Sequence, residues 1–202
     1  MDHCEDLIPV WLRFIKGVVD SSDLPLNVSR EMLQNNKQVE IMKKSITKKV
    51  LDTLAEMKRD ERSKYEDFYK GFGRILKEGI HFDYARRESI AELLLFPSTK
   101  TDPGSMITLV DYIDRMKPDQ QEIFYITAAS YDDAMRSPYL EAFAKKDIEV
   151  LIMRDEIDPI IMEDLAEFKG KKLKSITRGD IVLDKEEEKQ RLEADKKFSK
   201  LL

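Results

Sequence analysis

The hydrophobic pattern of this chain changes near Pro97, and that change constrains the fold most. Before Pro97, apolar residues recur every three or four positions, which places them on one face of a helix. After it, short β-branched and aromatic runs alternate with helical stretches, which is typical of strands joined by helices. The sequence therefore predicts an α/β protein, α+β by segregation. We expect a three-helix subdomain, a small α/β/α layer with a short parallel sheet, and finally a charged helix.

The first half of the chain predicts the three helices. The clearest amphipathic stripe covers 39–57, about five turns by the 3.6-residue period. A second helix follows, and we expect Gly79 to end it because glycine is favoured just past a helix C-terminus. A third runs from about Arg86 to Leu95 and stops before Pro97. The expected buried face of the second helix consists of Tyr65, Phe68, Tyr69, Phe72, Ile75 and Leu76.

Two shorter helical segments are expected upstream. Residues 7–19 place several apolar side chains on one broad helical face, with Pro9 in the first turn, where proline is tolerated. Ser29 is a suitable N-cap for a short helix that continues to Gln34.

The second half predicts alternating strands and helices. Because such βαβ units form parallel sheets, we expect helices on both faces of the sheet. The expected strands are 122–127, 148–153 and 173–176, and the expected helices are 131–145, with a break at Ser137-Pro138, and 158–168. From Asp184 the charged composition predicts a solvated helix or linker.

Composition limits the class of protein. The chain has 202 residues, enough for one large domain or two small ones. Its net charge of −5 comes from mixed charges, so we expect no nucleic-acid partner, which would call for a clustered basic face. A single cysteine, Cys4, excludes an internal disulfide framework and fits a reducing compartment. The apolar run 7–19 is too short for a membrane span and contains Arg13 and Lys16.

Few residues carry recognisable chemistry. There is no Walker loop and no G-x-G-x-x-G motif. The loop 127–130 has small residues that suit a ligand at strand ends, but a plain helix cap at Ser130 is the favoured interpretation. No metal site is expected, because His3 and His81 are far apart and Cys4 adjoins only His3. We expect His81 to follow a helix end, in a capping or solvent-facing role.

Arg30 is the most suggestive single residue. It follows the expected cap Ser29, and Gln34 lies four positions later on the same helix face. An arginine and a glutamine presented together can bind a phosphate oxygen and orient a water, as phosphoryl transfer requires. Such a pair is common, however, and taken alone it favours a structural role.

The run 7–34, LIPVWLRFIKGVVDSSDLPLNVSREMLQ, resembles the middle domain of the heat-shock protein 90 chaperone family, of the bacterial or organellar type. The resemblance continues in family order and covers essentially the whole chain. The further matching blocks are 65–81, 90–96, 111–117, 123–127, 137–140, 149–151 and 167–171.

The resemblance implies a domain map. Residues 1–25 would end the larger α/β part of the middle domain, and 26–97 would form a helical linker subdomain. Residues 98–180 would form the small α/β/α subdomain, and 181–202 would begin the C-terminal domain. The ATP-binding N-terminal domain would lie outside this chain.

The resemblance also implies site residues and cofactors. Arg30 matches the family arginine that contacts the γ-phosphate of ATP, and Gln34 lies beside it. Asn27 is a weaker candidate in the same loop and is also a suitable turn residue. ATP with magnesium would be the cofactor of the full-length protein. None is expected on this piece alone, which should not hydrolyse ATP.

The implied partners are client proteins, co-chaperones and the protein's own N-terminal domain, with a homodimer formed through a downstream domain. No membrane partner is expected, and the compartment would be a bacterial cytoplasm or an organellar lumen or matrix. Ile160, Ile161 and Met162 are candidates for an exposed client-binding patch, although helical spacing favours a core position for Ile161. Many family members carry an acidic and an aromatic residue where this chain has Pro159-Ile160, which counts against client contact there. A non-catalytic protein-interaction module without ATP dependence is the alternative function.

Overall fold

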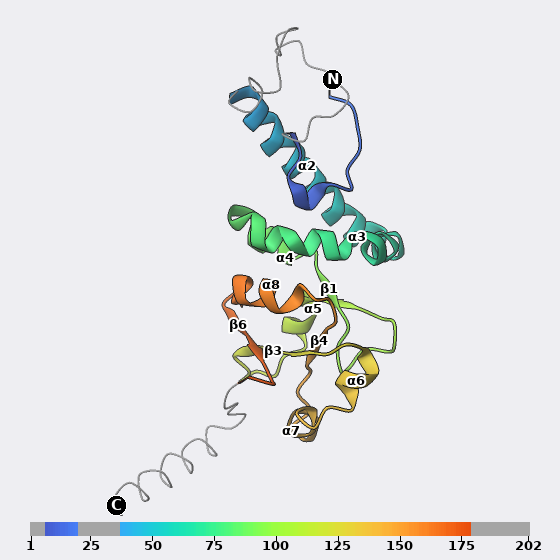
Figure 1. The fold of residues 1–202 in the computed structure, drawn as a ribbon. Helices are drawn as coiled ribbons and strands as arrows, with labels where there is room; N and C mark the ends of the chain where they lie inside the picture. The colour runs from blue at the N-terminus through green and yellow to red at the C-terminus, as the bar shows by residue number, and fades with distance from the viewer. Residues whose placement is uncertain (1–6, 20–36, 179–202) are drawn as a thin grey trace, which may run out of the picture.

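The computed structural model describes residues 7–19 and 37–178. The described part is layered, with helices at one end, a sheet below them and two short helices beyond the sheet (Figure 1). The predicted α/β class is confirmed, with the helices gathered before the sheet as expected. The elements of the helical end are η2 (Val10–Leu12), α2 (Lys37–Asp60), α3 (Arg62–Phe82), η3 (Tyr84–Arg86) and α4 (Arg87–Ala91).

Helix α2 confirms the clearest sequence prediction. Val39, Leu51 and Leu54 are buried along the face that packs inward. Thr47 is buried on the same face, where its hydroxyl donates to the carbonyl oxygen of Lys43 at 2.7 Å. That bond satisfies the polar group, so threonine is tolerated among apolar neighbours.

Helix α3 corrects the expected role of Gly79. The helix continues through Gly79 to Phe82, so the glycine does not end it. A Cβ atom at position 79 would lie 2.9 Å from both the Trp11 ring and the Ile90 side chain. Glycine is therefore needed for close packing between elements, a use that helix-end statistics do not reveal.

The expected helix over residues 7–19 is wrong beyond a single turn. Only Val10–Leu12 is helical, Pro9 precedes that turn, and Val18 is 96% exposed. Trp11 and Leu12 are buried against α3, and the Phe14 ring packs 5.3 Å from that of Phe68. Contacts with α3 therefore decide the path of this segment and override its local periodicity.

The expected third helix, 86–95, is also too long. Helix α4 ends at Ala91, and β1 (Leu95–Phe96) pairs antiparallel with β2 (Ile107–Thr108). Residues Leu93 to Phe96 are all buried, and periodicity cannot distinguish a helix from a strand in such a run. The unpredicted α5 (Leu109–Asp114) follows, with a capping box between Thr108 and Asp111.

The predicted strands form one sheet of order β4-β3-β6-β5. Its centre is parallel, because β3 pairs in parallel with β4 on one side and with β6 on the other. The short edge strand β5 was not predicted and pairs antiparallel with β6, so the sheet is mixed. The bounds are β3 (Glu122–Thr127), β4 (Leu151–Met153), β5 (Glu167–Phe168) and β6 (Lys171–Ser175).

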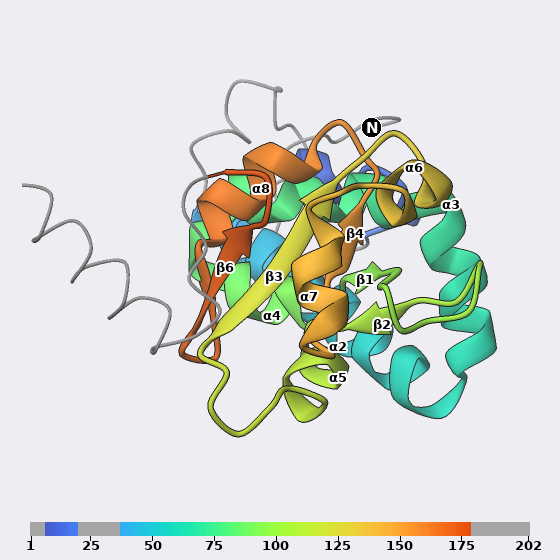
Figure 2. The ribbon, with the colours of Figure 1, turned by 90° about the horizontal axis from the view of Figure 1, so that it is seen from below.

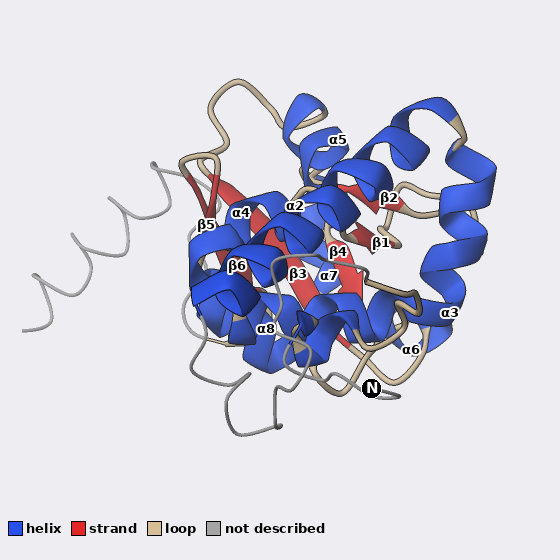
Figure 3. Ribbon diagram, turned by 90° about the horizontal axis from the view of Figure 1, so that it is seen from above, coloured by secondary structure: helices blue, strands red, loops and turns tan. Residues whose placement is uncertain are grey.

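Helices cover both faces of this sheet, as predicted (Figures 2 and 3). Ile123 and Tyr125 face the main core with α8 (Asp158–Leu165), whereas Phe124 and Ile126 face the side of α6 (Tyr131–Met135) and α7 (Leu140–Lys145). The break between α6 and α7 falls at Ser137-Pro138, as expected. Within the described residues, no helix combines the length and the apolar character that crossing a membrane requires.

Candidate functional site

The predicted catalytic residues Arg30, Gln34 and Asn27 lie in the segment 20–36, outside the described residues. Their roles stay predictions. The structure does describe the residues on both sides of this segment, 7–19 before it and those from Lys37 onward after it, and we call these flanking residues its frame.

The chain before the segment contacts the chain after it on the helical part. Leu7 and Val39 are buried against each other in a small apolar cluster, with Ile8, Met42 and Ile46 packed around it. The chain before the predicted catalytic segment therefore contacts the first turns of α2, the helix that follows it. The chain before the segment, at Leu7, and the chain after it, at Val39, therefore pack on the same unit.

An ion pair fixes the incoming end of the frame to α3. The Arg13 guanidinium binds the Glu78 carboxylate through both of its terminal nitrogens, with Nη2 2.7 Å from Oε1. The hydrogen bond from Arg13 holds the pKa of Glu78 below its usual value, against the opposing effect of partial burial. A two-bond arginine–carboxylate pair has a defined geometry, so it orients residue 13 relative to the helix.

A buried charge cluster joins α3 to the α/β part. The Lys77 ammonium lies 2.6 Å from an oxygen of Asp155 and 2.6 Å from Oδ1 of Asp158. The side chains of Lys77 and Asp158 are 4% and 0% exposed, and the ammonium also lies 4.8 Å from the centre of the Phe96 ring. Burial raises the pKa of Asp158, and the nearby ammonium opposes that rise.

Sequence reasoning missed this cluster, although a signal was present. Lys77 falls on the buried face of α3, beside Leu76 and one turn before Ile80. A lysine on an apolar face needs a buried anionic partner, because an unpaired buried charge is costly. Its partners come from the β4–α8 connection and the first turn of α8 and cannot be located from local spacing.

His81 takes part in a second link between the same two layers. It lies in the last turn of α3, so the expectation that it follows the helix end is wrong. Its Nδ1 atom is 2.7 Å from Oδ2 of Asp164 in α8. Arg87 of α4 donates to the carbonyl oxygens of Ile80 and Asp164, at 2.6 and 2.5 Å. α3, α4 and α8 are therefore held together by polar contacts as well as apolar ones.

The family model described as Hsp90 protein matches residues 1–202. The chain belongs to the Hsp90 protein family. Among curated relatives, the chaperone protein HtpG of Geobacter sulfurreducens is 52% identical over 193 residues, which cover 96% of this chain. The chaperone proteins HtpG of Bdellovibrio bacteriovorus and Paraburkholderia xenovorans are 50% and 49% identical over 98% and 94% of this chain. The resemblance recognised in the sequence is therefore confirmed.

This Hsp90 chain spans 30 to 31% of the length of the curated relatives that it matches. The likeness extends over nearly the whole chain, including the part of the sequence that holds the predicted catalytic residues.

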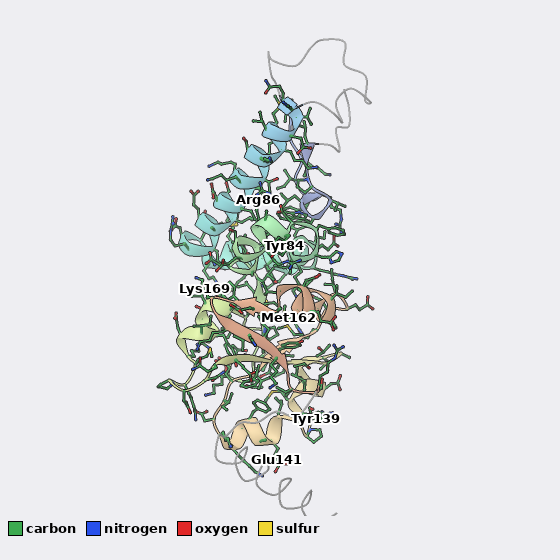
Figure 4. The ribbon with its side chains drawn as sticks, turned by 90° about the vertical axis from the view of Figure 1, so that its left-hand side faces the viewer. Tyr84, Arg86, Tyr139, Glu141, Met162 and Lys169 are labelled. Carbon is green, nitrogen blue, oxygen red and sulfur yellow. The ribbon has the colours of Figure 1, made fainter. Side chains whose placement is uncertain are left out.

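The predicted client patch of this Hsp90 chain needs correction. Ile161 and Met162 are 0% and 2% exposed and belong to the main core, so they do not form a surface. Figure 4 places Met162 beneath the helical layer. Ile160, on the outer side of α8, is 53% exposed. The core position that helical spacing favoured for Ile161 is confirmed, and Ile160 alone of the three is accessible.

The loop after β3 contains the helix cap that the sequence favoured at Ser130. The Ser130 hydroxyl accepts a hydrogen bond from the backbone N–H of Asp133, which makes Ser130 the N-cap of α6. Within residues 7–19 and 37–178, no three side chains of histidine, cysteine, aspartate or glutamate are grouped to hold a metal ion.

Proposed function

We propose that this Hsp90 chain is a middle-domain portion of an ATP-dependent molecular chaperone, and that Arg30 contacts the γ-phosphate of ATP held on another domain of the full-length protein. The observation that supports this is the match to the family over residues 1–202, with about half of the residues identical to proteins named chaperone protein HtpG. The proposed setting is a bacterial cytoplasm.

The proposed roles follow from the chemistry of phosphoryl transfer. Negative charge spreads over the γ-phosphate oxygens in the transition state, so catalysis depends on positioning and on nearby positive charge. An arginine stays protonated and can bind two phosphate oxygens with its planar guanidinium. Gln34, one helical turn later in the expected helix, would orient the attacking water. Asn27 would shape the turn that presents them, and ATP with magnesium would supply the reacting phosphate.

The frame around the segment fits this proposal. Leu7 and the Arg13–Glu78 pair attach the chain upstream of the segment to the helical part, Val39 attaches the chain that follows it, and Lys77 attaches α3 to α8. Closure of the nucleotide-binding domain onto this rigid part would bring Arg30 to the phosphate. Positioning of this kind accounts for a large share of catalysis, because the groups need no rearrangement during reaction.

We further propose that the full-length protein binds client proteins and dimerises through a downstream domain. Among the described candidates, Ile160 is the residue available for an apolar contact. This contact is a single exposed side chain, so we expect a small contribution to client binding from it.

The test is Arg30→Ala in the full-length protein. We expect the rate constant for ATP hydrolysis to fall by a factor on the order of 10³, the scale of an arginine that stabilises γ-phosphate charge, with little change in ATP affinity. Single-turnover hydrolysis measures the first quantity, and titration with a fluorescent nucleotide measures the second. Arg59→Ala is the matched control, because Arg59 is exposed and pairs with its neighbour Asp60.

Two outcomes would contradict the proposal. Equal losses of hydrolysis and ATP affinity would make Arg30 a binding residue with no special role in the transition state. Hydrolysis that is unchanged in Arg30→Ala would show that Arg30 takes no part in the reaction. A full-length protein that does not hydrolyse ATP would favour the protein-interaction module. The 202-residue chain alone should show no turnover, since the expected nucleotide pocket belongs to another domain.

A further inference from the structure

In the sheet of the α/β part, the connections that follow β3 and β4 leave toward opposite faces. The two strands are parallel neighbours, and Thr127 is paired with Met153 at their carboxyl ends. After β3 the chain turns to α6, which packs on one face of the sheet, and after β4 it turns to α8 on the opposite face. The carboxyl ends of β3 and β4 lie side by side, and in open α/β sheets ligands bind outside the carboxyl ends of the strands.

A cavity of about 430 Å³ lies at this point, within the range of small-molecule sites. The β3–α6 connection and the residue after β4 form its walls, and α3 and the 97–106 loop complete them. Figures 1 and 2 show α3, α6 and this loop on one side of the molecule. The lining includes the side chains of Lys70, Ser105, Met106, Tyr131, Asp132 and Arg154.

The charges around the cavity favour an anion. Arg154 is exposed and has no hydrogen bond or ion pair within the described part of the chain. Lys70 comes from α3. Its partner is the exposed Asp67, 2.9 Å away, and such a surface pair contributes little. Asp132 is the one carboxylate among the lining residues, so the lining carries a net positive charge.

The remaining lining indicates what surrounds the anionic group. Ser105 adds a hydroxyl, and Met106 and the Tyr131 ring add apolar area. The Ser130 hydroxyl is already used, because it accepts from the Asp133 N–H and lies 2.6 Å from an Asp133 oxygen. The site thus offers two cations from different elements, an apolar side, and the Ser105 hydroxyl, which has no hydrogen bond within residues 7–19 and 37–178.

We propose that this cavity binds the phosphate monoester of a small molecule, with Arg154 as the main phosphate ligand and Lys70 as the second. A phosphate monoester carries a charge of about −1.5 to −2 at neutral pH, which matches two cations better than a single carboxylate does. The volume of about 430 Å³ is that of a small-molecule site, so we assign the cavity to a free small molecule and not to a phosphorylated side chain of a partner protein. Because Lys70 belongs to α3 and Arg154 follows β4, the ligand bridges the helical layer and the sheet.

The experiment titrates the 202-residue chain with glucose 6-phosphate, with glucose and inorganic phosphate as companion probes, and follows backbone amide signals by NMR. We expect saturable shifts in 97–106, 129–132 and 154 with glucose 6-phosphate, weaker binding of phosphate and none of glucose. Affinity should rise between about pH 5 and 7, because the second phosphate ionisation lies near 6.

Variants make the assignment specific. Arg154→Ala should weaken binding at least about tenfold, the scale of one charge-assisted hydrogen bond. Lys70→Gln should weaken it less, and Asp132→Asn should strengthen it. Arg136→Ala is the matched control, since Arg136 is an exposed arginine at the other end of α6 and does not line the cavity.

Several results would overturn the proposal. These are an absence of saturable binding to the unaltered chain, equal losses in Arg154→Ala and Arg136→Ala, and weaker binding in Asp132→Asn. A phosphoserine peptide that binds where glucose 6-phosphate does not would also overturn it, because the ligand would then be a protein. Thermal unfolding of each variant verifies the fold, and all the substituted side chains are on the surface.

Discussion

Gly71 and Gly79 lie in the same helix, and their surroundings give opposite expectations for substitution by alanine. A Cβ at position 71 would meet nothing within 4 Å, whereas a Cβ at 79 would lie 2.9 Å from Trp11 and Ile90. We expect Gly71→Ala to raise the free energy of unfolding by about 0.5–1 kcal/mol through helix propensity. We expect Gly79→Ala to lower it by about 1–3 kcal/mol through overpacking. Urea unfolding measures both, and a stabilised Gly79→Ala would contradict the packing described.

Asp158 permits a test of the buried cluster. Asp158→Asn keeps the shape of the side chain but leaves the buried Lys77 ammonium with Asp155 alone. Removing one partner from a buried ion pair costs about 3–5 kcal/mol, and the remaining carboxylate should hold the loss near the lower limit, about 3 kcal/mol. Glu156→Gln is the control, because Glu156 is 91% exposed and its partner Arg74 is 3.4 Å away. Similar changes in the two variants, by urea unfolding, would show that the cluster contributes nothing special.

At the residue scale, spacing predicts which side of a helix is buried but not what it meets. The helical period favoured a core position for Ile161, which the structure confirms, and leaves Ile160 outside. Of the apolar residues predicted for the buried face of α3, Tyr65, Tyr69 and Leu76 are buried, whereas Phe72 is 40% exposed. Lys77 is buried on the same helix, and its aspartate partners follow about eighty positions later. Pairings over such separations depend on the whole fold, so no local pattern contains them. The catalytic predictions for Arg30, Gln34 and Asn27 lie outside the described residues and stay predictions.

At the scale of elements, the η2 segment is held on α3 by an ion pair whose contribution can be measured. Its Arg13–Glu78 pair lowers the pKa of Glu78 from the ordinary 4.5. A carboxyl group with a lowered folded pKa stabilises the fold fully above its unfolded pKa, and this stability is lost as the pH falls through the folded value. In a double-mutant cycle of Arg13→Ala and Glu78→Gln, the coupling free energy should therefore be constant well above pH 4.5 and decline as the pH falls through the lowered pKa of Glu78. Coupling that grows as the pH falls would have the wrong sign.

Helices and strands whose own sequence shows a clear hydrophobic pattern were predicted well. Elements whose form depends on contacts with distant parts of the chain were not. Helix α2 has a long amphipathic stripe, and β3 is a short β-branched and aromatic run, so both were correct. By contrast, β1 lies in an apolar run that suits a helix or a strand equally, and its pairing with β2 decides the outcome. The residues around Trp11 likewise take their form from the α3 surface, which local sequence cannot specify.

At the scale of the whole molecule, apolar packing continues across position 97, where the sequence predicts a domain boundary; that boundary stays a prediction. The main core continues from Trp11 and Leu54 in the helical part through Phe96 to Leu151 in the sheet. The Lys77 cluster and the Asp164 contacts of His81 and Arg87 cross the same boundary. We propose that the helical linker and the small α/β part form one cooperative unit, with α3 belonging to both.

This continuity predicts a single unfolding transition for the described part of the chain. Trp11, the one tryptophan, is buried against α3 and reports on the helical part through its fluorescence. Amide NMR signals of β3 report on the sheet. We expect both probes to give the same urea midpoint and the same slope, because a shared core links their regions and neither can unfold without exposing it. In Asp158→Asn both midpoints should fall together. A tryptophan transition that separates from that of β3 would show that the junction at α3 and α8 is a hinge between independently stable parts, and would support the predicted boundary near 97.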